Sequence, residues 1–400
     1  SINELDISEI AFLAALPKAP NNYDPQKNYF KALERRNWVI DKMYQNGFIS
    51  NDDLSFKNKP IQIFDRDNKS FVGADYFYEE IRKKLFLNYG TETLYSEGLI
   101  IKTSLNTNLQ QLAKESLIKG LIKYDKTQGW RGVVGNLDED NIEFKDAIKN
   151  IKNPFPKKWF VAKIEKIDSD KLFLKNIKLE NIEIDLNLQP NKWLMNKLFK
   201  KNDLLFVENY NSSYVLRQVP NVNGAIIVID PFSGDILAMS GGFSFDLSQF
   251  NRSTQAKRQP GSAFKPFVYI SALKKGYSPS TLILDAPYVI DQGPGLPKWK
   301  PANYSDEFYG LTTMRTGIEK SRNLMTIRLA NKIGVDTILS SAKDFKIEKY
   351  LDKNMSMSLG SGLVTLIDLT NAYGIIANGG KEIKPNIIKS IYSRNGKQIL

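Results

Sequence analysis

The sequence predicts a multidomain α+β protein. Its 400 residues exceed the size of one typical domain, so two to four units are expected. Apolar residues recur with helical spacing in the first third of the chain, whereas short alternating runs fill residues 159–209. A strand hairpin followed by helices accounts for the remainder. We therefore expect N-terminal helices in residues 1–55, a linker region in 56–125, a small OB-like β domain in 126–220 and a larger α+β domain in 221–400.

The N-terminal part predicts two helices. In ELDISEIAFLAAL, Asp6 and Ser8 precede an apolar face, and Pro17 ends the helical pattern. A Pro/Asn-rich loop, PKAPNNYDP, separates it from a second helical pattern that runs to Gly47.

The linker region is mixed. An amphipathic helix is expected around YFYEEIRKKLFLNYG, and a short strand in GLIIKTSL. Helical spacing returns over residues 106–124, where Asn106 or Thr107 is suited to cap the helix.

The pattern changes at Trp159. The short runs WFVAKIEKI, KLFLKNI, NIEIDL and DLLFVEN are separated by Asp, Ser, Asn and Gly, which is typical of a small antiparallel β unit. An OB-like barrel fits this pattern, either as a spacer or as a binding domain.

The last domain begins after Pro220. AIIVID and ILAMSGG predict two strands joined by the turn PFSGD. A polar loop follows, Pro260 and Gly261 end it, and SAFKPFVYISALKK predicts a helix that ends at Gly276.

Ser262 and Lys265 form a candidate nucleophile and base at the start of this helix. Residues three apart lie on one helical face, so the Lys265 amine can reach the Ser262 hydroxyl. Burial near a helix N-terminus disfavours the ammonium form, and backbone N–H groups there can hold an oxyanion. Pro266 lacks an N–H and is expected to leave the Ser262 carbonyl unpaired.

The bare Ser-x-x-Lys spacing is a weak signal. It recurs at Ser116 with Lys119 and at Ser340 with Lys343, where it fits solvated helix surface, and a serine at a helix start can simply act as a cap. The Pro-Gly loop after a hairpin is what favours a catalytic role for Ser262.

Composition excludes several kinds of chemistry. The chain has no Cys and no His, so thiolate nucleophiles, disulfides and a Ser-His-Asp triad are impossible. Acid–base steps must use Lys, Asp, Glu or Tyr, and the serine chemistry requires no metal or organic cofactor. The net charge of +12 comes from lysines spread through Asn- and Ile-rich segments, which favours compositional bias over a nucleic-acid partner.

No apolar window approaches the roughly 20 residues that span a bilayer. The chain opens on Ser1 without Met. We therefore expect a fragment whose true N-terminus, with any anchor, lies upstream.

The stretch RQPGSAFKPF, with AIIVIDPFSGDILAMSGG and FNRSTQAKRQ before it, closely resembles the transpeptidase domain of class A penicillin-binding proteins. These bifunctional enzymes build bacterial peptidoglycan, and Ser-x-x-Lys is their known signature. The resemblance continues through WKPANYSDEFYGLTTMRTGIEKSRNLMTIRLANKIG and MSMSLGSGLVTLIDLTNAYGIIANGG. The segment ISEIAFLAALPKAPNNYDPQKNYFKALERRNWVIDKM resembles the closing helices of their glycosyltransferase domain. An incomplete transpeptidase fold, similar to that of serine β-lactamases, is implied for residues 221–400.

The resemblance assigns roles to four residues. Ser262 is implied as the acylated nucleophile and Lys265 as its base. The second family motif, Ser-x-Asn, falls on Ser321 and Asn323. Ser321 can relay a proton between Lys265 and the leaving amine, and the Asn323 amide can bind a substrate peptide bond.

The Ser-x-Asn spacing is also a weak signal on its own. Ser-Arg-Asn recurs at residues 393–395, where Asn395 and Gly396 fit a hairpin turn, and the looser pattern occurs at Ser1 and Ser104. The alternative for Ser321 is an ordinary helix cap.

The third family motif, Lys-Thr-Gly, does not occur in the sequence; KTQG at 126–129 lies in another domain. In the family that strand comes later, and the glutamates of the glycosyltransferase come earlier. Both are expected outside residues 1–400, so no glycosyltransferase catalytic residue is predicted.

The resemblance implies a peptidoglycan D,D-transpeptidase that cross-links stem peptides, with its catalytic domains on the periplasmic side of the inner membrane. Implied partners are stem peptides, the lipid-linked precursor, β-lactams as inhibitors, the membrane and an outer-envelope lipoprotein activator. Two alternatives stay open. One is a hydrolase on the same fold, either a D,D-carboxypeptidase or a β-lactamase. The other is a non-catalytic fragment whose β unit, around residues 155–215, docks a regulator.

Overall fold

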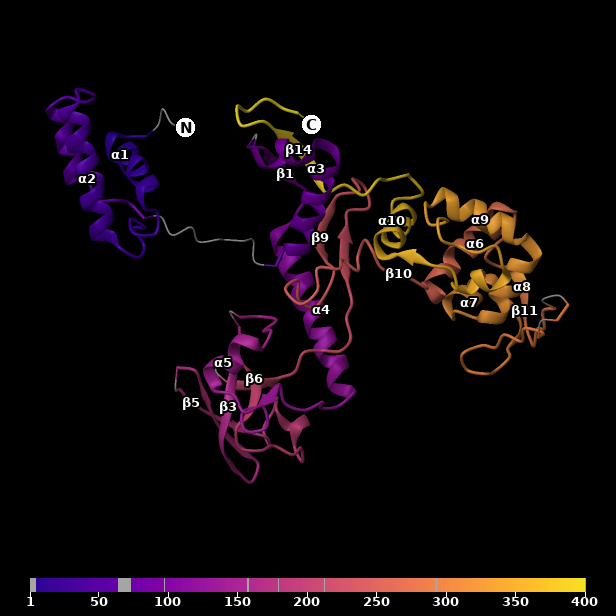
Figure 1. Ribbon diagram of the computed structural model, residues 1–400. Helices are drawn as coiled ribbons and strands as arrows, with labels where there is room; N and C mark the ends of the chain where they lie inside the picture. The colour runs from indigo at the N-terminus through magenta and orange to yellow at the C-terminus, as the bar shows by residue number, and fades with distance from the viewer. Residues whose placement is uncertain are drawn as a thin grey trace. The chain divides into compact units, whose positions relative to one another are not determined.

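The computed structural model describes residues 5–63 and 73–399, except residues 97, 157, 179, 212, 292, 293 and 296. The chain divides into two compact units, Ser1–Ser70 and Phe71–Leu400 (Figure 1). Helices and small sheets share the second unit, as the α+β class predicts. The finer division into four parts stays a prediction.

The first unit is helical, as its sequence predicts. Its elements are α1 (Ile7–Ala15), η2 (Leu16–Lys18), α2 (Tyr29–Gln45) and η3 (Asp52–Asn58). A capping box begins α1, because Asp6 Oδ1 accepts the Glu9 N–H and Glu9 Oε2 accepts the Asp6 N–H, both at 2.9 Å. Pro17 lies in η2, directly after α1, as expected.

A buried arginine ties these elements together. Arg36 on α2 is fully buried, and its guanidinium donates to Ser8 and Asn37 side chains. It also donates to the carbonyl oxygens of Lys57 and Lys59, at 3.0 and 2.8 Å. Carbonyls at the end of a helical turn lack partners of their own, so this guanidinium stabilises the end of η3.

The β unit in the second compact unit is antiparallel, as predicted. Its strand order is β2-β6-β3-β4-β5, and β7 pairs with β6. The strands are β2 (Gly135–Asn136), β3 (Trp159–Asp168), β4 (Lys171–Asn176), β5 (Asn181–Asp185), β6 (Asp203–Tyr210) and β7 (Ser213–Arg217). The predicted runs coincide with β3 to β6. The sequence interpretation missed β2, β7, helix α5 (Phe144–Asn150) and η4 (Lys192–Leu194).

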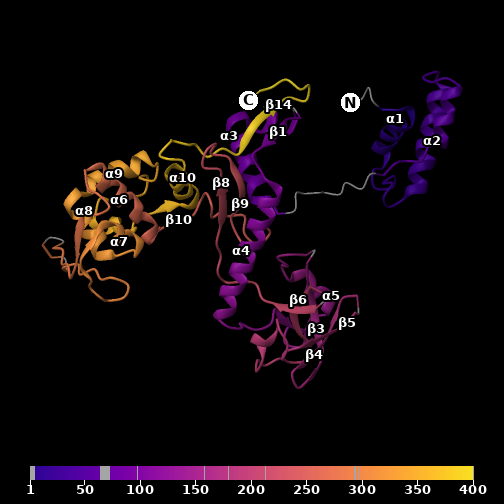
Figure 2. The ribbon, with the colours of Figure 1, turned by 180° about the vertical axis from the view of Figure 1, so that it is seen from behind.

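This sheet is buried on both faces, because successive side chains of a strand point to opposite sides. Ala162 and Val207 belong to a core inside the β unit. Trp159 and Phe206 belong to a second core that includes Phe243 and residues of α4 (Thr107–Thr127). Helix α4 therefore connects the β unit to the rest of the second compact unit (Figures 1 and 2).

The other end of α4 lies against the hairpin of β8 (Ile226–Ile229) and β9 (Ile236–Ser240), which forms where predicted. Figure 2 shows both strands beside α4. Asn106 caps α4, since its Oδ1 accepts the Leu109 N–H at 3.1 Å.

Two strands far apart in the sequence form a further small sheet. The predicted strand β1 (Ile100–Thr103) pairs antiparallel with β14 (Ile388–Tyr392). Ile388 and Ile391 share a core with residues of β9 and of α3 (Asp75–Ser96). This core joins the start and the end of the second compact unit.

The remaining elements form a mainly helical region with its own apolar core, which includes Phe264, Phe267 and Leu329. Its helices are η5 (Gly261–Phe264), α6 (Lys265–Lys274), α7 (Met314–Glu319), α8 (Asn323–Ile333), α9 (Val335–Asp344), η6 (Met355–Leu359) and α10 (Leu366–Ala377). Its strands are β10 (Lys257–Arg258), β11 (Leu282–Asp285), β12 (Gly310–Thr313) and β13 (Val364–Thr365). All four predicted site residues lie in this region.

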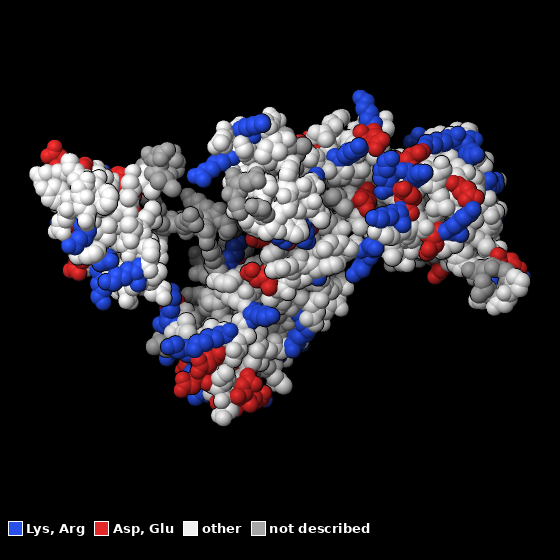
Figure 3. Space-filling model, turned by 45° about the horizontal axis from the view of Figure 1, so that its top comes forward, with Lys and Arg blue, Asp and Glu red and all other residues white. Residues whose placement is uncertain are grey.

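Basic and acidic side chains are interspersed on the face that Figure 3 shows. Among the described residues several basic and acidic side chains pair directly, as Lys353 does with Asp336 at 2.7 Å. Within the described part of the chain, no helix combines the length and apolar character needed to cross a membrane.

Candidate active site

Ser262 lies on a tight turn rather than inside an α-helix. The 3₁₀ turn η5 precedes α6, and the backbone N–H of Lys265 donates to the Ser262 carbonyl. The expectation that Pro266 leaves this carbonyl unpaired is therefore wrong. A 3₁₀ turn uses bonds three residues apart, so Lys265 supplies the N–H that Pro266 lacks. Ser262 itself is exposed, while Phe264 beneath it is fully buried.

Three contacts hold the Ser262 turn, which we define as residues 260–265. Strand β10 before it pairs with β13. The Gly261 N–H donates to the Gly360 carbonyl at 3.2 Å, and Tyr373 Oη of α10 donates to the Ala263 carbonyl at 2.8 Å. Gly360 has φ 80°, and a Cβ there would overlap the Gly261 carbonyl oxygen. Only glycine allows this approach.

The Lys265 amine is the centre of the site. The side chain is buried, and this burial lowers the pKa of Lys265 to about 8. Its Nζ donates to Asn323 Oδ1 at 2.6 Å, to the Ser321 carbonyl at 2.6 Å and to Ser321 Oγ at 3.1 Å. The structure thus brings Lys265, Ser321 and Asn323 into direct contact. Ser262 lies one turn away, and its Oγ makes no hydrogen bond to Nζ in the described structure.

Ser321 occupies a strained backbone position between α7 and α8. Its φ is 53°, and it closes α7 in a Schellman motif. The Ser321 N–H donates to the Ile318 carbonyl at 3.1 Å, and the Arg322 N–H donates to the Gly317 carbonyl at 2.9 Å. Glycine usually fills this left-handed position, because a side chain costs roughly 1–2 kcal/mol there.

Asn323 is the first residue of α8. Its Oδ1 accepts from Lys265, and its Nδ2 donates to the Ala302 carbonyl at 2.9 Å. Its backbone N–H donates to Asn303 Oδ1 at 2.9 Å, and Asn303 in turn contacts the buried Asp285. The sequence interpretation missed Asn303 and Asp285. Asn303 lies in WKPANYSDEFYG, but nothing in the spacing of that loop connects it to a helix start 20 residues later.

The other Ser-x-x-Lys copies lack this environment. Ser116, Lys119, Ser340 and Lys343 are exposed on helices, as predicted. The same spacing also occurs within α6, where Ser271 donates to the Phe267 carbonyl at 2.7 Å and Lys274 pairs with Asp344 at 2.8 Å. The Ser-Arg-Asn copy at residues 393–395 lies in the predicted turn, where the Gly396 N–H donates to the Ser393 carbonyl.

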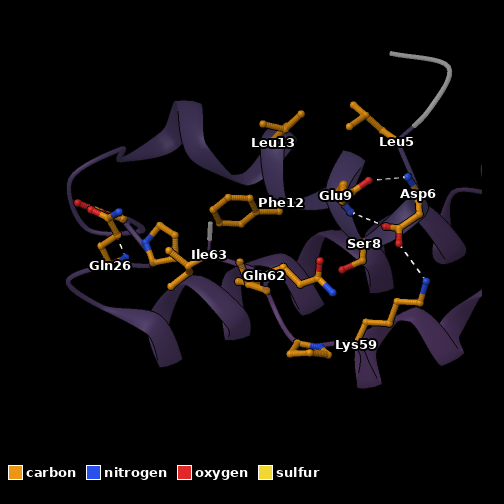
Figure 4. Close-up of a pocket in the computed structure, with 14 residues that line it drawn as sticks. Leu5, Asp6, Ser8, Glu9, Phe12, Leu13, Gln26, Lys59, Gln62 and Ile63 are labelled. Carbon is orange, nitrogen blue, oxygen red and sulfur yellow. Dashed lines mark hydrogen bonds and ion pairs between the residues drawn. The ribbon is translucent and has the colours of Figure 1, made fainter. Parts of the chain in front are cut away.

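A separate hollow of about 710 Å³ lies in the first compact unit, and none of the four predicted site residues lines it (Figure 4). Some of its polar groups are bonded to one another. Asp6 accepts from Glu9 N–H and from Lys59 Nζ, the latter at 3.0 Å. Across the described residues, no group of three or more His, Cys, Asp or Glu side chains is arranged to hold a metal ion.

Two family models match the chain. Residues 224–399 match the penicillin binding protein transpeptidase domain, and residues 1–44 match the transglycosylase family. The chain spans about half the length of the curated relatives that it matches.

Similar proteins cover almost the whole chain. Penicillin-binding protein 1A of Rickettsia typhi is 42% identical over 100% of this chain and 52% of its own length. Penicillin-binding protein 1A of Pseudomonas aeruginosa is 32% identical over 99% of this chain and 50% of its own length. The crystal structure of penicillin-binding protein 1A from Haemophilus influenzae, 28% identical, covers 100% of this chain and 60% of that chain with a TM-score of 0.78. This likeness confirms the predicted transpeptidase fold. The chain therefore belongs to the class A penicillin-binding proteins.

Proposed function

We propose that the intact protein is a serine-type peptidoglycan D,D-transpeptidase within a bifunctional glycosyltransferase and transpeptidase. One observation carries the proposal. The buried amine of Lys265 contacts both members of the Ser-x-Asn motif, one helical turn from the exposed Ser262. Family membership supports the same function.

In the acylation step Ser262 is the nucleophile. Its hydroxyl proton passes to the unprotonated Lys265 amine as Oγ attacks the carbonyl between two terminal D-alanines. The C–O bond forms and the C–N bond breaks. The proton then passes from Lys265, through Ser321 Oγ at 3.1 Å, to the leaving D-alanine amine.

In the second step an amine of a neighbouring stem peptide attacks the ester. The new C–N bond forms as the C–O bond to Ser262 breaks, and the proton of the amine returns to the serine oxygen by way of Lys265. Asn323 serves both steps, because an amide can donate to and accept from a substrate peptide bond. A β-lactam places a strained amide against the same serine and acylates it.

The substrates, the cellular location and the activator of the intact protein are part of the same proposal. The substrates are stem peptides and the lipid-linked precursor, and the protein works at the inner membrane with its catalytic domains on the periplasmic side. An outer-envelope lipoprotein is proposed as an activator. The match of residues 1–44 to the transglycosylase family favours a transpeptidase over a carboxypeptidase or β-lactamase on the same fold.

The test is covalent labelling of the intact protein with a fluorescent penicillin. Ser262→Ala is expected to abolish the label, because the only acylated oxygen is removed. Ser340→Ala is the matched control: it removes the serine of another Ser-x-x-Lys copy, exposed on α9, and is expected to label like the wild type. A folded Ser262→Ala protein that still labels would remove Ser262 from the proposed role.

A further inference from the structure

A buried carboxylate lies behind the Lys265 site. The Asp285 side chain, at the end of β11, is fully buried, and its Oδ1 accepts from Asn303 Nδ2 at 2.8 Å. Its Oδ2 has no hydrogen-bond partner among the described residues; the nearest cation, Arg322 Nε, is 4.0 Å away. A buried carboxylate held by so few bonds costs stability, so its presence calls for a reason other than stability.

That reason is the orientation of Asn303. An ionised carboxylate only accepts hydrogen bonds, so it binds the NH₂ end of the Asn303 amide and turns the oxygen end the other way. The Asn303 side chain is itself buried. Nδ2 also donates to the Glu307 carbonyl at 2.9 Å, which fixes the same orientation.

The oxygen end of Asn303 caps helix α8. Asn303 Oδ1 accepts the backbone N–H of Asn323 at 2.9 Å and that of Leu324 at 3.3 Å. These are the first N–H groups of the helix, and the residue at its own N-cap position, Arg322, makes no side-chain cap. The cap is supplied from a loop 20 residues upstream.

The same loop also holds the Asn323 side chain by a hydrogen bond. The carbonyl of Ala302, next to Asn303, accepts from Asn323 Nδ2 at 2.9 Å, so Asn323 Oδ1 faces Lys265 Nζ. We infer that Asp285 and Asn303 are positioning residues that fix the Asn323 amide, and through it the amine of Lys265. The inference rests on the proposed function, since it concerns the same acylation step.

The test exchanges the two residues. In Asn303→Asp alone, two carboxylates face each other across the 2.8 Å contact and cannot both be ionised there. The acylation rate constant of the intact protein with a fluorescent penicillin is expected to fall about 10- to 100-fold, the range for a lost bond to a charged group. The dissociation constant of the penicillin, obtained from the concentration dependence, is expected to stay nearly constant.

The double variant, which combines Asp285→Asn with Asn303→Asp, restores the pairing in reverse. The amide introduced at position 285 would donate to one oxygen of the carboxylate introduced at position 303, and the other oxygen of that carboxylate would still cap α8. Partial recovery is expected, to within about 3- to 10-fold of the wild-type rate constant, because the double variant still lacks the one neutral hydrogen bond from position 303 to the Glu307 carbonyl. Asp285→Asn alone can still accept from Asn303 and is expected to lose less than about tenfold.

Asn106→Ala is the matched control, because it removes another asparagine helix cap, that of α4, away from the site. It is expected to lower the melting temperature and leave the rate constant unchanged. Wild-type acylation in Asn303→Asp, or a double variant that is folded but as slow as Asn303→Asp, overturns the inference. A double variant that does not fold also counts against it, because the exchange is predicted to restore the contact. Labelling of Ser262→Ala separately decides the proposed function.

Discussion

At Lys265, burial alone brings an amine into the range where it can lose a proton near neutral pH. Desolvation lowers its pKa to about 8, and the bonds from Nζ go to neutral oxygens of Ser321 and Asn323. The three bonds that Nζ donates are those of the ammonium form; the neutral amine keeps two N–H groups and has a lone pair, which can take the proton of a hydroxyl. The residue is therefore suited to act as a base without help from His or a carboxylate.

A rise of acylation with pH follows from this shift. The neutral amine is the active form, so the acylation rate constant is expected to increase about tenfold per pH unit well below pH 8, because the neutral fraction does so. It is expected to level off above pH 8. The profile is measured with the intact protein and a fluorescent penicillin.

Lys274→Met serves as the control for this profile, because Lys274 lies on the same helix but is exposed and paired with Asp344. It is expected to keep the wild-type pH dependence. A rate constant that stays flat between pH 6 and 8 would exclude Lys265 as the base.

The sequence allowed prediction of the four proposed catalytic residues but not of the residues that we infer position them. Ser262 with Lys265, and Ser321 with Asn323, are each close together in the chain, so a short motif contains them. Asp285 and Asn303 contact residues 18 and 20 positions away, through side-chain contacts that no periodicity reveals. Gly360 and Tyr373 were missed for the same reason.

At the scale of elements, the most consequential contact is that between η5 and the loop after η6. The Gly261 and Gly360 backbones touch, so the position of Ser262 depends on a segment 98 residues later. The sequence predicts an α-helix from Ser262, yet the first turn is 3₁₀. The turn departs from α-helical geometry because its backbone is fixed by contacts with neighbouring segments. These are the pairing of β10 with β13 and the hydrogen bonds to Gly360 and Tyr373.

Gly360→Ala tests this contact. The added Cβ would overlap the Gly261 carbonyl oxygen, so the Ser262 turn must move, and we expect acylation to fall at least about tenfold, the effect of a misplaced reacting group. Gly379→Ala is the matched control, because Gly379 has a similar φ of 82° but no atom within 4 Å. Both variants should lose about 1–2 kcal/mol of stability from the left-handed backbone. Equal acylation rates in the two variants would contradict the contact argument.

Strand prediction succeeded for the long alternating runs β3 and β6 and for some short strands, such as β5 and β8, but it missed β2 and β7. β2 has two residues and owes its existence to its pairing with β6. Similarly, β7 has five residues and pairs only with β6. Such strands are defined by their neighbours, so the local sequence holds too little signal.

At the scale of the whole molecule, the second compact unit contains several separate apolar cores. The core of the β unit includes Leu174, whereas the core beneath the candidate site includes Leu329 on α8. Both leucines are buried almost completely. Damage to one core should therefore leave the other in place.

Leu174→Ala and Leu329→Ala test this independence as a matched pair. Each is expected to cost about 2–5 kcal/mol in the core that it empties. Thermal unfolding should show a lower transition temperature for both variants. Only Leu329→Ala should slow penicillin acylation at temperatures below its transition. An equal loss of acylation in Leu174→Ala would show that the β unit and the site are energetically coupled.

The pairing of β1 with β14 has a consequence for synthesis. Residues 100–103 leave the ribosome early, but their partners at 388–392 emerge only after residues 104–387 have been made. Until then the backbone N–H and C=O groups of the early strand have no ladder to join, and an unpaired strand edge favours association with other chains. The small sheet of β1 and β14 thus cannot close until residues 388–392 have emerged, long after β1 itself.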